Sequence, residues 1–379
     1  MSGQFHPLTL LRNLLRPLDP ALLAILALLF AYGWVLMTSA SPERLPTLRM
    51  HMMIAVGVMW IVAAIPVQRL LSLAAPLYLG GVVLLVGVLL FGEISKGAQR
   101  WLDLGIVRLQ PSEFMKIATP LMLAWYFHVR DGVTSWHDYV VAAVLLAIPL
   151  GLIVVQPDLG TSLLVAAAGL FVIFFAGLSW KLIVPVFTVA VVGIVLLVGF
   201  GDQLCQPDVD WHLLREYQKQ RVCTLLDPNQ DPLGRGFHTI QSTIAIGSGG
   251  LWGKGWMDGT QTHLAFIPER HTDFIFAVLA EEFGLIGALV LLGLYLLLIL
   301  RGLRIAARAP MPGARLLAGA VTMIVFTYAF VNIGMVSGIL PVVGVPLPFL
   351  SYGGTALVTL CIGMGMLMSV ARSRRTPKD

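Results

Sequence analysis

The sequence predicts an all-α polytopic membrane protein with about ten transmembrane helices. Hydrophobic residues make up 58% of its 379 residues and charged residues only 12%, and the mean hydropathy is +0.86. A soluble domain carries roughly 25% charge, so this chain lacks the polar surface that water requires. Its apolar stretches reach spanning length without the alternation of a β-barrel strand of about 10 residues, which indicates helices.

Apolar windows place these helices along the chain. The Gln-Pro-Asp sequence at 156–158 divides one long apolar run into two helices joined by a tight turn. The segment 272–301 is too long for one span, which predicts a short interfacial helix over about 272–283 and then a span from Gly284. The predicted spans are 21–40, 49–67, 73–92, 112–128, 139–156, 160–177, 181–200, 273–301, 315–338 and 353–371.

The positive charges of the connecting segments predict the orientation, because Lys and Arg are enriched in cytoplasmic loops. An even number of spans puts both termini on one side of the membrane. Most of these positive charges lie on that same side, so both termini are predicted to be cytoplasmic. The chain then forms a single integral-membrane domain, 1–379, with a cytoplasmic lead-in at 1–20, a tail at 372–379 and a long periplasmic loop at 201–271 between helices seven and eight. The net charge of +5 does not indicate nucleic acid, since the basic residues are dispersed.

Three cysteines occur in the chain. Cys361 lies in the last predicted helix, where it is expected to be a small buried apolar residue. Cys205 and Cys223 both fall in the long periplasmic loop, and an oxidising compartment makes them candidates for a disulfide. The alternative is two free thiols too far apart to bridge.

The richest group of ionisable residues closes the long loop, where Glu269, Arg270 and His271 precede Asp273. Ionisable groups at a membrane boundary are costly there and are therefore functional candidates. An apolar, aromatic run follows Asp273, so its charged form is disfavoured, as suits a general base. The alternative is an acid at the N-cap or first turn of the helix, favoured by the helix dipole.

A second group of charges surrounds the start of the fourth predicted helix. Arg100 and Arg108 precede that helix, and Glu113 and Lys116 lie three residues apart on one of its faces, where they can pair. Pairing with Glu113 would let the charge of Lys116 lie within the membrane. The three cations suit an anionic ligand such as a lipid pyrophosphate. The alternative is a loop that contacts headgroups, next to a structural ion pair.

Two further segments interrupt the apolar pattern. The glycine-rich run 247–255, which contains Lys254, lacks P-loop spacing and a flanking strand, so it does not indicate nucleotide binding. Its glycines would let the backbone approach a sugar or phosphate, or would simply make a flexible loop. The segment 347–355, with Ser351, breaks the chain before the last helix, either as a cavity-lining broken helix or as a turn. The spacing of His, Cys and carboxylates indicates no metal site.

From about Pro20 to Ser373 the sequence resembles the SEDS family (shape, elongation, division and sporulation). The matching stretches, in order, are 94–101, 110–113, 156–161, 247–255, 268–276 and 348–354. The segment 339–348 is more similar to the elongation members than to the division members. Residues 201–215, which include Cys205, depart from the family pattern as a local insertion.

The resemblance implies a ten-helix fold in the bacterial inner membrane and a peptidoglycan glycosyltransferase. Such an enzyme polymerises lipid II into glycan strands during cell elongation and releases undecaprenyl pyrophosphate. The family's essential aspartate corresponds to Asp273, and its nearby polar positions to Arg108, Glu113, Lys116 and Asp158. The expected partners are a class B penicillin-binding protein, which supplies the transpeptidase, and other membrane proteins of the elongation complex, with no nucleic acid.

This resemblance leads us to expect that Asp273 accepts the proton of the 4-hydroxyl of incoming lipid II. Arg100, Arg108 and Lys116 would stabilise the leaving pyrophosphate, because preorganised charge is usually the largest catalytic term. Further residues expected to bind substrate are Lys254, Glu269, Arg270, His271 and Ser351. No residue pattern demands a cofactor, and a divalent cation (Mg²⁺ or Mn²⁺) beside the pyrophosphate stays open.

Two hypotheses from other functional classes also fit the sequence. In a lipid II flippase or transporter, Asp273 and Glu281 would serve transit, and broken helices with intramembrane charges suit that role. In a non-catalytic scaffold of the elongation complex, the chain would only recruit a synthase, and loss of Asp273 would be tolerated. A polymerisation assay in detergent separates both from a polymerase.

Overall fold

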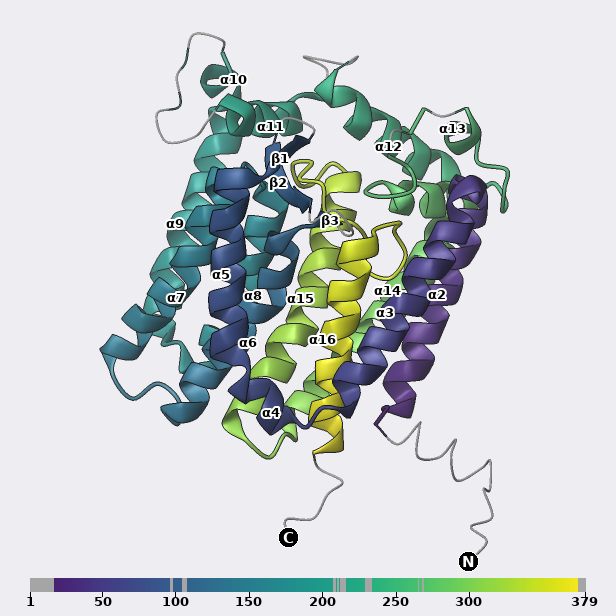
Figure 1. Cartoon of the computed structure of the whole chain (residues 1–379). Coiled ribbons are helices and arrows are strands. Elements are labelled where there is room, and N and C mark those ends of the chain that lie inside the picture. The colour runs from purple at the N-terminus through teal and green to yellow at the C-terminus, as the bar shows by residue number, and fades with distance from the viewer. Residues whose placement is uncertain are drawn as a thin grey trace, which may run out of the picture.

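The structure is a computed structural model, and its long helices stand side by side as a bundle (Figure 1). It describes residues 17–95, 98–103, 108–206, 209, 211, 216–228, 234–264, 266–267 and 269–373. The long helices are α2 (Pro20–Ala40), α3 (Leu45–Ala64), α5 (Ala74–Phe91), α6 (Pro111–Val129), α7 (Trp136–Val155), α8 (Leu159–Gly177), α9 (Trp180–Gly199), α14 (Ile275–Ala307), α15 (Pro312–Val336) and α16 (Gly354–Arg372). Helix α12 (Arg235–Gly249) lies across one end of this bundle. The start of α2 and the end of α16 lie at the same end of the bundle.

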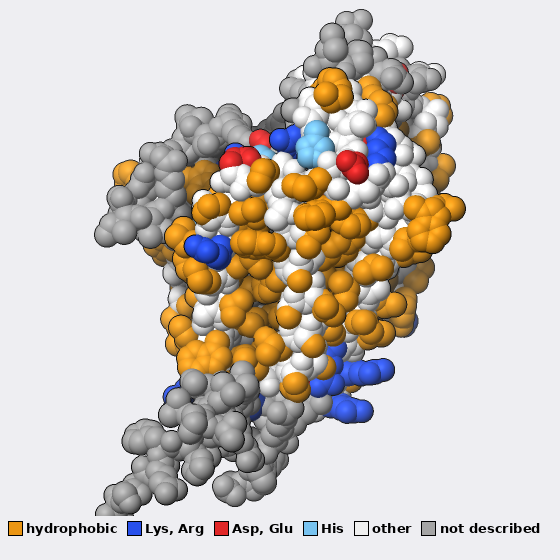
Figure 2. Space-filling view, turned by 90° about the vertical axis from the view of Figure 1, so that its right-hand side faces the viewer, with side chains coloured by type: hydrophobic (Ala, Val, Ile, Leu, Met, Phe, Trp, Pro, Cys, Tyr) orange, Lys and Arg blue, Asp and Glu red, His pale blue; other side chains and the backbone are white. Residues whose placement is uncertain are grey.

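Each predicted span corresponds to one helix of the bundle, which confirms the predicted fold class. In the described part of the chain, nine helices are long and apolar enough to cross a membrane. The predicted span 112–128 is α6, which is not among the nine; its first turns carry Glu113 and Lys116, and most of its residues are buried. Figure 2 shows a hydrophobic belt between two ends where charged side chains gather.

Both predicted interruptions of the long apolar runs are present. Helix α7 ends at Val155 and α8 begins at Leu159, with Asp158 as the N-cap that accepts a hydrogen bond from Thr161 N at 3.3 Å. Helix α14 consists of two helices that meet at Gly284, whose φ of +63° and ψ of −160° are not helical. A glycine adopts this conformation without the steric cost that a side chain would bring.

The two long connections contain elements that the hydrophobic pattern did not predict. The segment 93–111 holds a small antiparallel sheet in the order β1-β2-β3. The described residues of the segment 201–271 form four helices, which Figure 1 shows gathered at one end of the bundle. The short elements are η1 (Pro42–Arg44), α4 (Val67–Ser72), β1 (Glu93–Ser95), β2 (Ala98–Asp103), β3 (Arg108–Leu109), α10 (Gly201–Leu204), α11 (Glu216–Leu226) and α13 (Thr260–His263).

Helices α15 and α16 form the centre of the bundle, since 78% of the spanning window of each is buried. Small residues allow this close packing. A Cβ added at Gly319 of α15 would lie 2.9 Å from the ring of Phe175, and one added at Gly302 of α14 would lie 2.2 Å from Thr322 Oγ1. No residue of the α9 window is buried, so α9 stands at the edge of the bundle.

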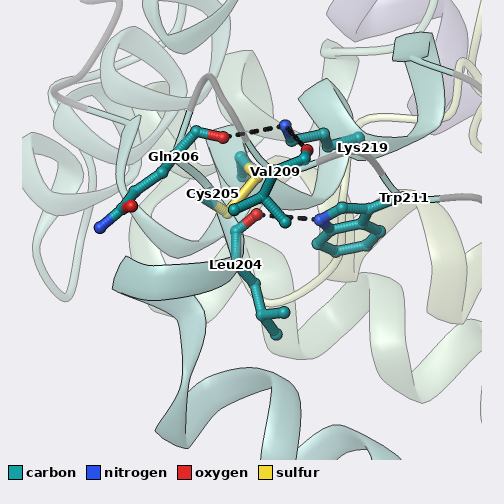
Figure 3. The surroundings of a disulfide bond; sticks show 7 residues. Leu204, Cys205, Gln206, Val209, Trp211 and Lys219 are labelled. Atoms are coloured by element: carbon teal, nitrogen blue, oxygen red, sulfur yellow. Dashed lines mark hydrogen bonds between the residues drawn. A yellow bond between two sulfur atoms is a disulfide. The ribbon is translucent and has the colours of Figure 1, made fainter.

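A disulfide joins Cys205 and Cys223, the pair for which the sequence left two alternatives (Figure 3). It links the chain after α10 to α11. The same region is held by Lys219, whose ammonium donates to Gln206 O at 3.0 Å and Val209 O at 2.5 Å. Trp211 Nε1 also donates to Leu204 O at 2.9 Å. Cys361 is buried and free, as expected.

Candidate functional site

Asp273 lies in the turn directly before α14. The N-cap of that helix is Phe274. The alternative in which Asp273 is the N-cap is therefore wrong. The side chain of Asn332, buried in α15, donates to Asp273 O and to Val345 O, each at 2.7 Å. One amide therefore joins the segment before α14 to the segment that precedes α16.

Gly344 brings the chain before α16 against the carboxylate of Asp273. A Cβ added at Gly344 would lie 3.5 Å from Asp273 Oδ2, and the φ of Gly344 is +73°, which favours glycine. The neighbouring chain also packs against the start of α8, since a Cβ added at Gly160 would lie 2.7 Å from Val343 O. Residues 343–345 are thus in contact with Asp273 on one side and with the first turn of α8 on the other.

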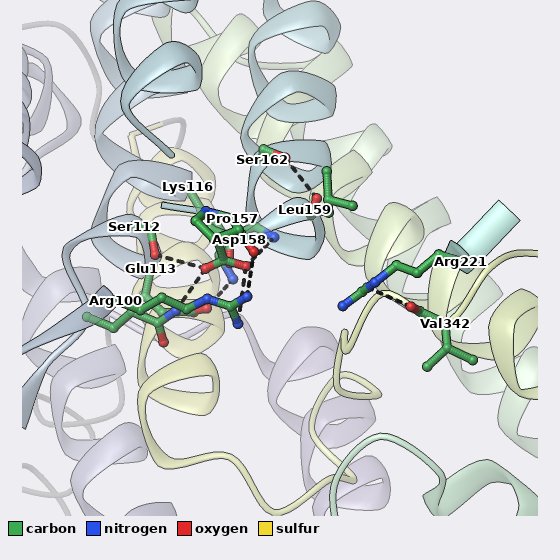
Figure 4. A network of polar contacts seen from close by, with 12 residues as sticks. Arg100, Ser112, Glu113, Lys116, Pro157, Asp158, Leu159, Ser162, Arg221 and Val342 are labelled. Atoms are coloured by element: carbon green, nitrogen blue, oxygen red, sulfur yellow. Dashed lines mark hydrogen bonds and ion pairs between the residues drawn. The ribbon is translucent and has the colours of Figure 1, made fainter. Parts of the chain in front are cut away.

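Asp158, the N-cap of α8, is the centre of a polar network (Figure 4). Its Oδ2 accepts hydrogen bonds from Gln110 Nε2 at 3.1 Å and Ser112 Oγ at 3.4 Å. Arg100 Nη1 lies 3.9 Å from Asp158 Oδ1, and Arg100 Nη2 donates to Pro157 O at 2.6 Å. The side chain of Arg100 is 31% exposed, so it is not fully enclosed by protein.

Lys116 and Glu113 form the ion pair that their spacing predicts. Lys116 Nζ donates to Glu113 Oε1 and to the hydroxyl of Tyr328 on α15, and it lies 4.8 Å from the centroid of the Tyr328 ring. Lys116 is 1% exposed, so its ammonium is enclosed by protein. A cavity of about 10 Å³, room for one water molecule, adjoins Lys116 and Tyr328.

Aromatic and charged side chains surround the segment that leads to Asp273. The guanidinium of Arg44 lies 5.3 Å from the ring centroid of Tyr352, and the ring of His271 meets Tyr352 edge-on at 6.0 Å. His271 Nε2 is 3.8 Å from Glu269 Oε2. Burial, and then the charge of Arg44, lowers the pKa of His271, so the ring is neutral at neutral pH.

The structure places Lys254 apart from these groups. Lys254 Nζ donates to Glu281 Oε1 at 2.8 Å. Glu281 is fully buried, and its two oxygens also accept hydrogen bonds from Thr260 Oγ1, Gln261 N, and both N and Oγ1 of Thr262. Lys254 therefore belongs to a structural network on α14, which we name the Glu281 anchor (Glu281, Lys254, Thr260, Gln261 and Thr262).

The glycine-rich run approaches protein backbone, where the sequence suggested a sugar, a phosphate or a flexible loop. A Cβ added at Gly249 would lie 1.9 Å from Ala280 O, and one added at Gly253 would lie 2.1 Å from Glu282 O. These glycines let the run pack directly on α14 beside its kink. The run is therefore a packing element of α14.

Two other expected substrate ligands are occupied by internal hydrogen bonds. Ser351 is buried, and its Oγ accepts a hydrogen bond from Leu347 N at 2.8 Å, as in a turn. Arg270 Nη1 donates to Thr262 O. The backbone of Arg108 pairs with Asp103 in the sheet, while its side chain lies outside the described part of the structure.

Arg44, Tyr328, Asn332 and Gly344 are site residues that the sequence did not reveal. Asn332 had a detectable signal, because an amide in the middle of an apolar span needs a buried partner. The other three are recognised only by contacts between distant segments. Among the described residues, no group of three or more His, Cys, Asp or Glu side chains is placed to hold a metal ion.

The fold and the site define a polytopic membrane protein with a polar network at the ends of its helices. A family profile described as cell cycle protein, for FtsW, RodA and SpoVE, matches residues 20–376, and the chain belongs to this family, which is the SEDS family. It is 53% identical over 361 residues to the peptidoglycan glycosyltransferase MrdB of Escherichia coli strain K12, covering 94% of each chain. It is 34% identical over 357 residues to the peptidoglycan glycosyltransferase RodA of Treponema pallidum, covering 78% of this chain and 82% of that protein.

Solved structures show the same fold. One chain in a structure described as a peptidoglycan synthase complex, which coordinates polymerization and crosslinking, matches with a TM-score of 0.78 and 34% identity, over 95% of this chain and 99% of that chain. The rod shape-determining protein RodA of Thermus thermophilus matches with a TM-score of 0.70 and 30% identity, over 95% of this chain and 98% of that chain.

Proposed function

We propose that this chain polymerises lipid II into glycan strands during cell elongation and releases undecaprenyl pyrophosphate, with Asp273 as the general base. Its enzyme class is that of a peptidoglycan glycosyltransferase, the name that relatives up to 53% identical carry. One observation carries the residue assignment. Residues 343–345 contact both the Asp273 carboxylate and the first turn of α8, where Asp158 pairs with Arg100.

In the proposed step, the Asp273 carboxylate takes the proton of the 4-hydroxyl of incoming lipid II. The hydroxyl oxygen bonds to the anomeric carbon of the growing strand, and the bond from that carbon to the pyrophosphate oxygen breaks. The bonding electrons leave with undecaprenyl pyrophosphate. A positioned general base contributes about 10²–10⁴-fold to the rate of such a reaction.

Arg100 is the cation best placed to stabilise the pyrophosphate. It combines a partly exposed side chain with two partners, Asp158 and Pro157 O, that orient its guanidinium. Arg108 is in the neighbouring strand of the same sheet and is proposed for the same task. Lys116 is enclosed by Glu113 and Tyr328, and we assign it the task of orienting Glu113.

The proposal includes the surroundings in the cell. The chain spans the bacterial inner membrane, with the end that carries Asp273 on the periplasmic side. Its partner is a class B penicillin-binding protein, together with other membrane proteins of the elongation complex. Similarity to a chain from a peptidoglycan synthase complex supports a partner that crosslinks the glycan.

The test is polymerisation of purified lipid II in detergent by the chain with its class B partner, whose transpeptidase is blocked by penicillin. Asp273→Ala is compared with the wild type and with Asp258→Ala, which removes an exposed carboxylate outside the site. We expect long glycan from the wild type and Asp258→Ala and none from Asp273→Ala, with equal thermal unfolding of all three. Equal product from Asp273→Ala would move the base elsewhere. No product from any variant would support the flippase or the scaffold.

The same assay tests the divalent cation. Product is measured with Mg²⁺, with Mn²⁺ and with excess chelator. A loss with chelator that either ion restores would show that a cation accompanies the pyrophosphate. Equal product under the three conditions would show that the protein cations are sufficient.

A further inference from the structure

The loop 250–257 exposes a group of large apolar side chains. They are Leu251, 62% exposed, Trp252, 80%, Trp256, 51%, and Met257, 45%. Apolar surface of this extent is unfavourable in water, so an exposed patch of this kind marks an interaction surface. The neighbouring elements and the depth of the loop indicate what covers it.

Two contacts place the loop below the end of the spanning helices. Trp256 Nε1 donates to Val35 O at 3.3 Å, and Val35 lies five residues before Ala40, the last residue of α2. At 1.5 Å per residue this is about 7.5 Å along the helix axis. Leu285 N, directly after the kink of α14, donates to Gly250 O at 3.0 Å. The loop therefore lies level with membrane-spanning segments of two helices.

The backbone and charge of the loop suit a medium without water. Lys254 N donates to Glu281 O and Gly255 N to Glu282 O, each at 3.0 Å, so these amides are satisfied by the protein. Unpaired backbone groups are excluded from lipid, and such pairing is the condition for a loop to enter it. Lys254 is the loop's single charged residue, and Glu281 neutralises it at 2.8 Å.

The apolar patch continues onto the outer face of α14. Ile286 N donates to Leu251 O at 3.2 Å, which joins the loop to the first turn after the kink. Leu285, Ile286 and Leu289 are exposed large apolar residues of the same helix. Figure 2, which views the bundle from the side of α2, shows that hydrophobic side chains dominate the belt between the charged ends. The loop is thus continuous with a surface that the bilayer covers.

We propose that loop 250–257 inserts into the interfacial region of the lipid bilayer and anchors the first half of α14 at a fixed depth. Tryptophan prefers this region, because its ring is apolar and its N–H is polar. Gly249, directly before the loop, packs closely against α14, since a Cβ added there would lie 1.9 Å from Ala280 O. If the proposed function holds, the inserted loop 250–257 keeps Asp273 at the depth where a lipid-linked sugar leaves the membrane.

The depth of the loop is measured with a nitroxide label on Trp252→Cys in the full chain, with Cys361→Ala to remove the free thiol. The protein is placed in nanodiscs of phosphatidylethanolamine and phosphatidylglycerol, which leave both faces open to water. Collision rates are compared for oxygen, which concentrates in lipid, and a water-soluble nickel chelate. Leu289→Cys on the outer face of α14 is the lipid control, and Asp131→Cys, exposed between α6 and α7, is the water control.

We expect the oxygen-to-nickel ratio at position 252 to approach that of the lipid control and to exceed that of the water control several-fold. A ratio equal to the water control would overturn the proposal. Protection of the label from both reagents would also overturn it, because a protein would then cover the patch. This measurement needs no enzymatic activity, so its outcome is independent of the proposed function.

A second experiment tests the effect on the active segment. Trp252→Glu places a charge in the interface, whereas Trp252→Phe keeps an aromatic ring. We expect Trp252→Glu to lower glycan synthesis several-fold in nanodiscs and to leave it unchanged in detergent, which imposes no bilayer depth, while Trp252→Phe retains synthesis in both. Equal synthesis by Trp252→Glu and wild type in nanodiscs would refute the link between depth and turnover. A loss in detergent as well would also refute it, because the effect would then be on the protein itself.

Discussion

The Glu281 anchor and the network around Asp158 and Lys116 differ in how completely their buried charged groups are hydrogen-bonded. Both oxygens of Glu281 accept hydrogen bonds, from five donors in all. In the other network, Glu113 Oε2 and Arg100 Nε are buried and have no hydrogen-bond partner among the described residues. The neutral amide oxygen of Gln261 in the Glu281 anchor also has no partner among the described residues, so the contrast is between the charged groups. A buried carboxylate with both oxygens paired stabilises a fold, while charged groups with an unsatisfied atom are typical of places where water or a ligand supplies the missing bond. The contrast predicts that the first network serves stability and the second serves chemistry.

The largest effect is expected from Glu281→Ala. The substitution removes the carboxylate that the Lys254 ammonium and the donors of residues 260–262 share, and breaking a buried ion pair costs about 3–5 kcal/mol of stability. Thermal unfolding in detergent should show a large drop in midpoint, with activity falling only as the folded fraction falls. The double variant Glu281→Leu with Lys254→Met removes both charges and should recover part of the loss. A stable Glu281→Ala protein without activity would contradict this and would assign Glu281 a role in catalysis.

Arg100→Ala should show the opposite pattern. Removing one donor that stabilises charge in the transition state lowers turnover by about 10²–10³-fold. The unfolding midpoint should change less than in Glu281→Ala, because Arg100 is partly exposed. Arg100→Lys is the matched control, since it keeps the charge and loses the planar fork, and it should fall between the two. Equal turnover of Arg100→Ala and wild type would remove Arg100 from pyrophosphate binding.

Part of this organisation follows from the sequence alone. The length of the segment from 272 to 301 was enough to predict two helices meeting at Gly284, and the structure has that kink. The Gln-Pro-Asp sequence predicted the break before α8, and the three-residue spacing predicted the pair of Glu113 and Lys116. Each of these depends on local chemistry, which a hydrophobic pattern and residue spacing record directly.

Features that depend on distant contacts were not predictable in this way. Lys254 and Glu281 are separated by 27 residues, and no periodicity joins them. The glycine-rich run suggested closeness to a ligand, but whether a glycine approaches a ligand or a helix is decided by packing, and here it approaches α14. Helices α11 and α12 were not predicted, because polar residues interrupt their apolar pattern and no apolar run there is long enough to span a membrane.

Gly344→Ala tests the contact between the two parts of the site. A left-handed conformation costs a residue with a side chain about 1–2 kcal/mol, and the new methyl would lie 3.5 Å from Asp273 Oδ2. We expect a modest fall in unfolding midpoint together with a larger fall in glycan synthesis, as the carboxylate shifts. Gly57→Ala in α3 meets no atom within 4 Å and should lower neither quantity. Unchanged glycan synthesis in Gly344→Ala would show that residues 343–345 do not contribute to the reaction.

The smallest effect is a pH dependence of stability that involves neither network. Burial is the main cause that lowers the pKa of both His238 and His271 below the ordinary value of 6.5. The unfolded chain therefore binds more protons than the folded chain as pH falls through 6.5, so stability should decrease there and level off below the folded pKa values. Unfolding midpoints between pH 8 and pH 5 should show this slope in the wild type and a flatter one in His238→Gln with His271→Gln. His137→Gln, exposed at the start of α7, should keep the wild-type slope, and an unchanged slope in the double variant would assign the acid sensitivity to other groups.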